Sequence, residues 1–347
     1  MNPWEIFDRT SPHVERRENI TTVDVSVVVP TYNGAQYLAA ALDSIGQQTM
    51  RPREVIVVDD GSTDGSPEIA EQMGARVIRL SRSGVCVARN RGITEATSSW
   101  IALLDQDDLW LPTKLERQCN AAALHTDAVL IATDAAKVDG NNHLVLASFI
   151  HADFMHYNRV QPTSRENGID YFASGQDALR YAGWFLLPSA VLARRDALVA
   201  SGMFDERITL HEDVSCFTRV LANGALVVIH EALTGWRIHS SNTHFNTLAM
   251  LRGALSLTRI AVLEPQAYPY WFVKKHTDAL PGLLLEIGRA EMAVNNASAA
   301  RAALSEAISR GAGSRAGLLW LMSHLGANNF ERLASLSRGF RSKKPTT

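Results

Sequence analysis

The chain has 347 residues, of which 46% are hydrophobic and 20% are charged, so it is long enough for a sizeable core and an appendage. Its formal net charge of −2 at pH 7 excludes the strongly basic balance typical of nucleic-acid-binding proteins. The three cysteines lack C-x-x-C spacing, the polar N-terminus lacks the apolar core of a signal peptide, and no apolar run approaches a membrane span, so we expect a soluble cytoplasmic protein.

Strand and helix patterns alternate through the first part of the chain. A charged, aperiodic extension over residues 1–22 precedes a β-branched run at 23–30, which predicts a buried strand. The elements predicted next are a helix at 35–48, a strand at 53–58, a helix at 65–73, a strand at 75–80, a helix at 85–97 and a strand ending at Asp105. This alternation predicts an α/β fold with a doubly wound, mostly parallel sheet.

The pattern is less regular after this point. We expect strands over 128–150, an irregular stretch over 151–180, an apolar segment at 184–192, helices near 194–201 and 212–222, and a strand at 226–229. Beyond about residue 247, apolar residues at helical intervals predict an appendage of about four helices. The predicted organisation is an extension at 1–22, an α/β domain at 23–246 and a helical region at 247–347.

Three carboxylates lie at and just after the end of the strand that is predicted to end at Asp105. Asp105, Asp107 and Asp108 lie in L-L-D-Q-D-D-L-W, at the strand end where open α/β sheets bind ligands. Acids this close repel one another, and a hard divalent cation relieves the repulsion, usually together with a substrate phosphate. The pattern predicts a site for a metal-bound diphosphate, unless the acids only cap the following helix.

Two earlier strand ends point to the same edge of the sheet. The turn P-T-Y-N-G at 30–34 brings Thr31, Tyr32 and Asn33 there, and Tyr32 suits stacking on a flat base, unless the segment is an ordinary turn. Asp60 lies in V-V-D-D-G-S, where a carboxylate accepts hydrogen bonds from a base or a ribose, unless this segment only caps the next helix.

Two further segments carry charged residues of interest. Arg89, in A-R-N-R-G, offers a charged fork to a phosphate, and the alternative is a solvated surface arginine. Glu212 and Asp213, in H-E-D, begin a predicted helix, where they either offset the helix dipole or hold a general base near the metal site.

In this order, P-T-Y-N-G, D-D-G-S, A-R-N-R-G, L-D-Q-D-D and H-E-D resemble the motifs of the family 2 glycosyltransferases, over about residues 23–240. The resemblance implies the GT-A fold, a Rossmann-like, mostly parallel sheet flanked by helices, here with a C-terminal helical appendage. It implies an inverting enzyme that uses Mn²⁺ or Mg²⁺ to move a sugar from a nucleotide-diphospho-sugar to an acceptor hydroxyl, in polysaccharide, lipopolysaccharide or other glycan synthesis. The alternative is a non-catalytic nucleotide-sugar-binding module of the same fold.

The resemblance also assigns roles to individual residues. Asp107 is the expected metal ligand, with His239 of W-R-I-H as a further ligand or a structural histidine. Asp213 is the expected catalytic base, and Glu212 is the fallback. The donor-binding set is Pro30, Thr31, Tyr32, Asn33, Asp60, Arg89, Asp105, Gln106 and Trp110, whose indole either floors the sugar site or fills the core.

The expected partners follow from the same resemblance. A UDP-sugar is the preferred donor, GDP- and dTDP-sugars are alternatives, and the acceptor is a glycan or a lipid-linked molecule. Aromatic and basic residues interleave over 328–344, which predicts peripheral contact with the inner face of a membrane or a solvated tail, and the helices over 275–325 are alternatively an oligomer interface. The first loop lacks G-x-G-x-x-G and the chain lacks G-x-x-x-x-G-K-[ST], which excludes a dinucleotide-dependent dehydrogenase and a P-loop ATPase.

Overall fold

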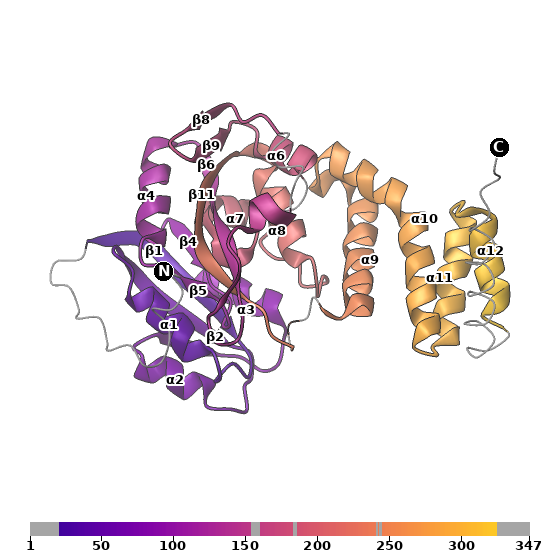
Figure 1. The fold of residues 1–347 in the computed structure, drawn as a ribbon, viewed down its shortest axis with the longest axis horizontal. Coiled ribbons are helices and arrows are strands. Elements are labelled where there is room, and N and C mark those ends of the chain that lie inside the picture. The colour runs from indigo at the N-terminus through magenta and orange to yellow at the C-terminus, as the bar shows by residue number, and fades with distance from the viewer. Residues whose placement is uncertain (1–20, 154–159, 183–185, 241, 243–244, 325–347) are drawn as a thin grey trace, which may run out of the picture. The chain divides into compact units, whose positions relative to one another are not determined.

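The computed structural model describes residues 21–153, 160–182, 186–240, 242 and 245–324. The chain divides into two compact units, Met1–Asn242 and Thr243–Thr347. The described elements of the first unit are a sheet and its flanking helices, and those of the second unit are helical (Figure 1).

The described strands form one eleven-stranded sheet, and its first half is parallel. β1 (Thr22–Thr31) lies between β2 (Arg51–Asp59) and β4 (Trp100–Leu103), and β3 (Arg76–Arg79) pairs with β2. β1 and the second half of β2 are rich in valine and isoleucine because both faces of a parallel sheet are buried there. Thr31 is in register with Asp59, so the carboxyl ends of neighbouring strands meet at one edge.

The second half of the sheet mixes strand directions. β10 (Val191–Arg194) runs antiparallel between β4 and β6 (Ala128–Val138), and β11 (Ala225–Arg237) runs parallel to β6. The short β5 (Leu109–Trp110) pairs with Thr234 and Gly235 of β11, which brings the acids after β4 next to the end of β11. The remaining strands are β7 (Leu144–Leu146), β8 (Ser164–Glu166) and β9 (Ile169–Phe172).

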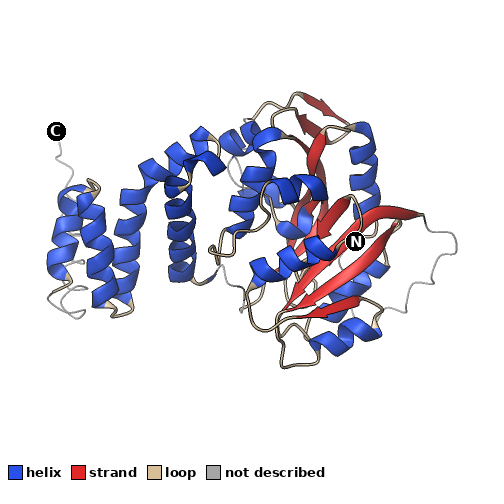
Figure 2. Ribbon diagram, turned by 180° about the vertical axis from the view of Figure 1, so that it is seen from behind, coloured by secondary structure: helices blue, strands red, loops and turns tan. Residues whose placement is uncertain are grey.

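Helices cover both faces of this sheet (Figure 2). Side chains alternate along β1, so Val27 and Val29 contact the core beneath α1, α2 and α4, while Val28 faces α3. The helices of this unit are α1 (Leu38–Gly46), α2 (Ser66–Gln72), α3 (Val85–Glu95), α4 (Lys114–Leu124), α5 (Phe149–Asp153), α6 (Gly175–Ala182), α7 (Arg195–Ala200) and α8 (Glu212–Val220). The second unit holds α9 (Thr247–Leu263), α10 (Tyr270–Ala293), α11 (Ala297–Ser309) and α12 (Gly313–Met322).

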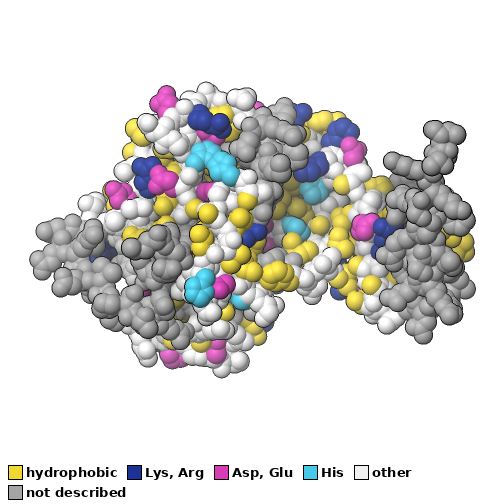
Figure 3. Space-filling view, in the orientation of Figure 1, with side chains coloured by type: hydrophobic (Ala, Val, Ile, Leu, Met, Phe, Trp, Pro, Cys, Tyr) yellow, Lys and Arg dark blue, Asp and Glu magenta, His cyan; other side chains and the backbone are white. Residues whose placement is uncertain are grey.

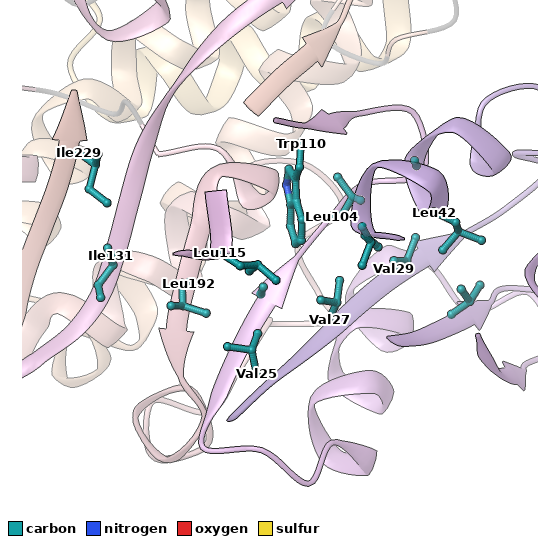
Figure 4. Close-up of a cluster of buried hydrophobic side chains, with 14 of the residues drawn as sticks. Val25, Val27, Val29, Leu42, Leu104, Trp110, Leu115, Ile131, Leu192 and Ile229 are labelled. Carbon is teal, nitrogen blue, oxygen red and sulfur yellow. The ribbon is translucent and has the colours of Figure 1, made fainter. Parts of the chain in front are cut away.

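The packing of α3 on the sheet depends on one glycine. A Cβ atom at Gly92 would lie 2.3 Å from Val28 Cγ1, so a side chain at this position forces the helix away from β1. The opposite face holds Trp110, which has no exposed surface and lies among Leu104, Leu115 and their neighbours (Figure 4). Burial of Trp110 corrects one expectation: its indole fills the core and offers no floor to a sugar.

The strands and helices predicted up to Asp105 are present within a few residues of their expected bounds. The described chain beyond residue 247 is helical, as expected, and holds α9 to α12. One prediction was wrong: the described part of residues 151–180, expected to be irregular, contains β8, β9 and most of α6. The strands expected over 128–150 are present as β6 and β7, which pair antiparallel, and α5 follows them from Phe149. The carboxylate of Asp134, a residue of β6, accepts hydrogen bonds from the backbone N–H groups of Phe149 and Ile150 and so caps α5. Because the capping residue lies 15 positions before the helix, local sequence patterns do not predict it.

None of the described helices is long and apolar enough to span a bilayer. The basic and aromatic segment 328–344 lies outside the described residues.

Candidate active site

The acidic loop after β4 is anchored by one serine and one arginine. Ser189 lies in the short 3-10 helix Pro188–Ala190; its hydroxyl accepts the Asp105 N–H at 3.0 Å and donates to Asp108 Oδ2 at 2.6 Å. Asp108 Oδ1 accepts the backbone N–H of Arg237 at 3.0 Å. Burial, together with the nearby charges of Asp107 and Asp105, raises the pKa of Asp108 well above its usual range. Asp108 is therefore the internal support of the loop, while Asp105 and Asp107 remain partly exposed at the edge.

Asp107 and His239 come together across the sheet edge. Asp107 lies between β4 and β5, His239 follows β11, and His239 Nε2 lies 3.0 Å from Asp107 Oδ2. The ring of Tyr37 stacks on the imidazole with 4.9 Å between centroids. Carboxylate oxygen and imidazole nitrogen are donors that Mn²⁺ accepts, and such cations often complete their coordination with substrate phosphate and water. The pair therefore fits a divalent cation, although no cluster of three or more histidine, cysteine or acidic side chains suited to a metal occurs in the described part of the chain.

Another histidine–aspartate contact lies on the N-terminal part of β11. His230 Nε2 is 2.9 Å from the buried carboxylate of Asp170, which also binds Arg165 through both its oxygens. Histidine side chains lie beside acidic ones on the face drawn in Figure 3. The Arg165 guanidinium balances the buried charge of Asp170, so we interpret this contact as structural.

Arg89 joins the acidic loop to the start of α8. Its Nη2 donates to Asp105 Oδ1 at 2.7 Å, and its Nη1 donates to Glu212 Oε1 at 2.6 Å. The arginine is 3% exposed, so it is no solvated surface residue. In this structure the guanidinium of Arg89, which the sequence offers to a phosphate, binds two carboxylates instead. It thereby links Asp105 to Glu212, which lies 123 positions beyond Arg89 in the chain.

Asp213 lies beside this ion pair at the first turn of α8. His211, with φ of 65°, turns the chain into the helix directly before Glu212. Burial first, and then the charge of Glu212, raise the pKa of Asp213 to about 7. A carboxyl group with a pKa near neutrality is suited to take a proton from a hydroxyl group. Glu212 is less suited because its Oε1 already accepts a hydrogen bond from Arg89 Nη1.

Tyr32 and Gln106 connect the first turn to the acidic loop. The Gln106 side chain accepts the Tyr32 N–H at 2.9 Å and donates to the Tyr32 carbonyl oxygen at 3.2 Å. A Cβ atom at Gly34 would lie 2.2 Å from Gln106 Oε1, which explains the glycine of P-T-Y-N-G. Tyr32 is 38% exposed, and the Arg82 guanidinium carbon lies 3.1 Å from the centroid of its ring. An exposed ring beside a guanidinium suits a flat, anionic ligand.

The other residues expected in the donor site mainly shape its walls. Asn33 accepts the Thr63 N–H at 2.8 Å and so joins the first two turns. Asp60 is 4% exposed, and its carboxylate accepts the N–H groups of Ser83 and Gly84, which orders the loop before α3. Pro30 and Thr31 are buried at the end of β1, and neither side chain offers surface to a ligand in this structure.

Several residues that contact this site were absent from the sequence prediction. Among them are Ser189, Arg82, Tyr37 and Arg237. Arg237 lies in the W-R-I-H segment, which gave a local signal, whereas Ser189 and Arg82 lie in segments without a recognisable pattern.

A doubly wound sheet with acids and a charged helix start at its carboxyl edge defines a class of α/β proteins that bind nucleotide ligands there. The profile of glycosyl transferase family 2 matches residues 26–200, and the chain belongs to this family of glycosyltransferases.

Relatives in sequence agree with this assignment. The chain is 29% identical over 239 residues to an uncharacterized glycosyltransferase of Rickettsia typhi, covering 68% of this chain and 70% of that protein. It is 26% identical over 204 residues to the amylovoran biosynthesis glycosyltransferase AmsB of Erwinia amylovora, covering 55% and 62%.

Solved structures share the fold. Residues 1–349 of Staphylococcus aureus TarS align with a TM-score of 0.58 at 18% identity, covering 93% of each chain. The mannosyltransferase PcManGT from Pyrobaculum calidifontis, in complex with GDP-Man and Mn²⁺, aligns with a TM-score of 0.55 at 19% identity, covering 93% of this chain and 88% of that one. The predicted GT-A fold is confirmed.

Proposed function

We propose that the protein is an inverting, metal-dependent glycosyltransferase that moves a sugar from a nucleoside-diphosphate sugar to an acceptor hydroxyl. One observation carries the proposal: the acidic loop contacts His239 through Asp107 and the start of α8 through Asp105 and Arg89. The cation-binding pair and the helix start that carries the candidate base are thereby linked to the same short loop. A structural role alone would not require the partly exposed Asp107 and His239 to face each other.

Asp107 and His239 are the residues that we assign to Mn²⁺ or Mg²⁺. Their oxygen and nitrogen atoms, 3.0 Å apart, fit two neighbouring positions of a coordination shell. The chemistry that a divalent cation supplies at such a site is neutralisation of the charge that grows on a leaving diphosphate. The complex of PcManGT with Mn²⁺ supports a divalent cation as the cofactor.

Asp213 is the proposed base. It takes the proton of the acceptor hydroxyl while the hydroxyl oxygen bonds to the anomeric carbon, and the bond from that carbon to the diphosphate oxygen breaks with its electron pair on the diphosphate. One displacement inverts the anomeric centre and needs no covalent enzyme intermediate. Glu212, paired with Arg89, holds the helix start beside Asp105 and takes no proton.

Tyr32, with Arg82 against its ring, is the proposed contact for the base of the nucleotide. A UDP-sugar is our preferred donor: TarS has been solved with UDP and with UDP-GlcNAc, although PcManGT holds GDP-Man. AmsB, a transferase of amylovoran biosynthesis, supports a polysaccharide or another glycan as acceptor. We assign this chemistry to residues 23–246. We propose that any contact with a membrane or with a second copy of the chain is made by the helical region, residues 247–347.

Turnover separates this proposal from a non-catalytic binding module. The purified protein is incubated with UDP-, GDP- and dTDP-sugars and Mn²⁺, with and without glycan acceptors, and release of nucleoside diphosphate is measured. We expect release from one class of donor that chelation stops and Asp213→Asn greatly slows. Tight binding of a donor without release, at any pH between 6 and 9 and with every acceptor, would favour the binding module.

A further inference from the structure

A buried arginine beside the acidic loop has no part in the chemistry above. Arg237 ends β11 and is 2% exposed. Its Nε donates to the Asp107 carbonyl oxygen at 2.7 Å, and its Nη1 donates to Asn142 Oδ1 at 2.6 Å and to the Gly140 carbonyl oxygen at 3.3 Å. The guanidinium therefore ties the Asp107 peptide to the turn between β6 and β7.

The same guanidinium also lies close to the partner of Asp107. Its carbon atom is 4.8 Å from the centroid of the Tyr37 ring, and Tyr37 stacks on His239 at 4.9 Å with 27° between the ring planes. Tyr37 immediately precedes α1, which packs on the core, so this ring is a firm support. Arg237 thus contacts Asp107 through the backbone and influences the orientation of the His239 ring through Tyr37.

We propose that Arg237 is a positioning residue that holds Asp107 and His239 in the arrangement needed to bind a divalent cation. This inference rests on the proposed function, which assigns the cation to that pair. The Arg237 backbone N–H donates to Asp108 while its side chain donates to Asp107, so two successive residues of the acidic loop are fixed by one residue of β11.

The hydrogen bonds of Arg237 depend on the planar, forked shape of its guanidinium and not on its charge alone. Its donors have fixed directions, and here they reach acceptors on three residues from two different segments. A lysine carries the same charge on a flexible stem and reaches one of these acceptors well. The competing explanation is that Arg237 only balances the charges of Asp107 and Asp108, and a lysine would then serve equally.

The test compares Mn²⁺ affinity, measured by calorimetry with Mn²⁺ alone and with UDP or GDP present, in Arg237→Met and Arg237→Lys. Partners that orient metal ligands typically change affinity by about 10–100-fold when removed, so we expect a loss of this size in Arg237→Met and most of it in Arg237→Lys. Arg195→Met is the matched control, because Arg195 donates to the carbonyl oxygens of Ile93 and Thr94 near the other end of β4. We expect it to keep wild-type Mn²⁺ affinity.

Each result decides between the explanations. The inference is overturned if Arg237→Met binds Mn²⁺ as tightly as wild type, or if Arg237→Lys does. If Arg237→Met does not fold, Asn142→Gly removes one acceptor while tolerating the φ of 67° at that residue, and it must weaken Mn²⁺ binding severalfold for the inference to stand. Wild-type protein that binds no Mn²⁺ with any nucleoside diphosphate contradicts the proposed metal site itself, a different failure from that of Arg237.

Discussion

Asp107 Oδ2 lies 3.0 Å from His239 Nε2, although 132 residues separate them in the chain. Pairing of β5 with β11 produces this contact, because it places the end of the acidic loop beside the end of the last strand. The buried Trp110 fixes Ser189: its indole N–H donates to the Ser189 carbonyl oxygen at 2.7 Å. The hydroxyl of Ser189 in turn donates to Asp108 of the acidic loop. The position of the proposed metal pair therefore depends on the core of the sheet.

Asp213→Asn should abolish most turnover while donor binding survives. The substitution keeps the shape of the side chain and removes its basicity, and loss of a general base typically costs about a hundredfold to ten-thousandfold in kcat. Single-turnover kinetics and donor affinity are measured together. Asp196→Asn, at the start of α7, is the control, with wild-type kcat expected. Wild-type kcat in Asp213→Asn would show that the base is another group.

The pH dependence of kcat should follow the ionisation of Asp213. Because burial and Glu212 raise its pKa to about 7, the carboxyl group is protonated below that pH and accepts no proton. We expect kcat to rise tenfold per pH unit below about pH 7 and to level off above it. A profile that is flat from pH 5 to 8 would contradict the assignment.

The raised pKa of Asp213 also predicts that Asp213→Asn, which loses activity, does not lose stability. A raised carboxyl pKa means that the folded state favours the proton, so ionised Asp213 destabilises the fold as pH rises from its unfolded pKa through about 7. At pH 8, Asp213→Asn should therefore unfold at the same temperature as wild type or a higher one, as thermal unfolding followed by circular dichroism will show. A clear drop in that temperature would mean that Asp213 is held by interactions other than those described.

Arg89→Met should destabilise the protein and inactivate it. Removing the guanidinium leaves Glu212 and Asp105 facing each other without a cation, and breaking a buried ion pair in this way typically costs about 3–5 kcal/mol of unfolding free energy. Chemical denaturation measures this loss. The double variant with Glu212→Gln should recover part of the stability because one buried charge is then removed. A single variant as stable as wild type would show that the pair does not hold α8 to the acidic loop.

Gly92→Ala tests the packing of the fold independently of the site. A methyl group there meets Val28 at 2.3 Å, and overpacking of this kind typically costs about 1–3 kcal/mol. Gly46→Ala is the matched control, since its Cβ would meet no atom within 4 Å. Equal melting temperatures for the two variants would contradict the close contact of α3 with β1.

The sequence predicts the elements that carry their own pattern. The strands ending at Thr31, Asp59 and Leu103 are runs of apolar and β-branched residues, and short motifs mark the ends of all three. Alternation of strand and helix then places Asp105 and Asp107 at one edge with Tyr32, and the GT-A fold follows from the family resemblance.

Partners supplied by distant segments could not be predicted in this way. The bond from Ser189 to Asp108 spans 81 residues, and nothing in P-S-A distinguishes that serine from a surface residue. The sequence motif around Arg89 suggests a phosphate ligand, whereas in the structure its guanidinium binds two carboxylates. Trp110 belongs to the core because residues of β10 and α4 pack around it, and the sequence near Trp110 does not reveal these neighbours. These contacts arise from tertiary packing, which local periodicity does not encode.

The most direct test of the account measures the affinity of UDP, GDP and dTDP for wild-type protein and for Asp107→Ala, each with and without Mn²⁺. We expect Mn²⁺ to tighten binding of at least one nucleoside diphosphate to the wild type by tenfold or more, and to have no effect on the variant. Affinities that are the same with and without Mn²⁺ in the wild type, or an equal gain in Asp107→Ala, would contradict the assignment of a diphosphate-binding cation to Asp107 and His239.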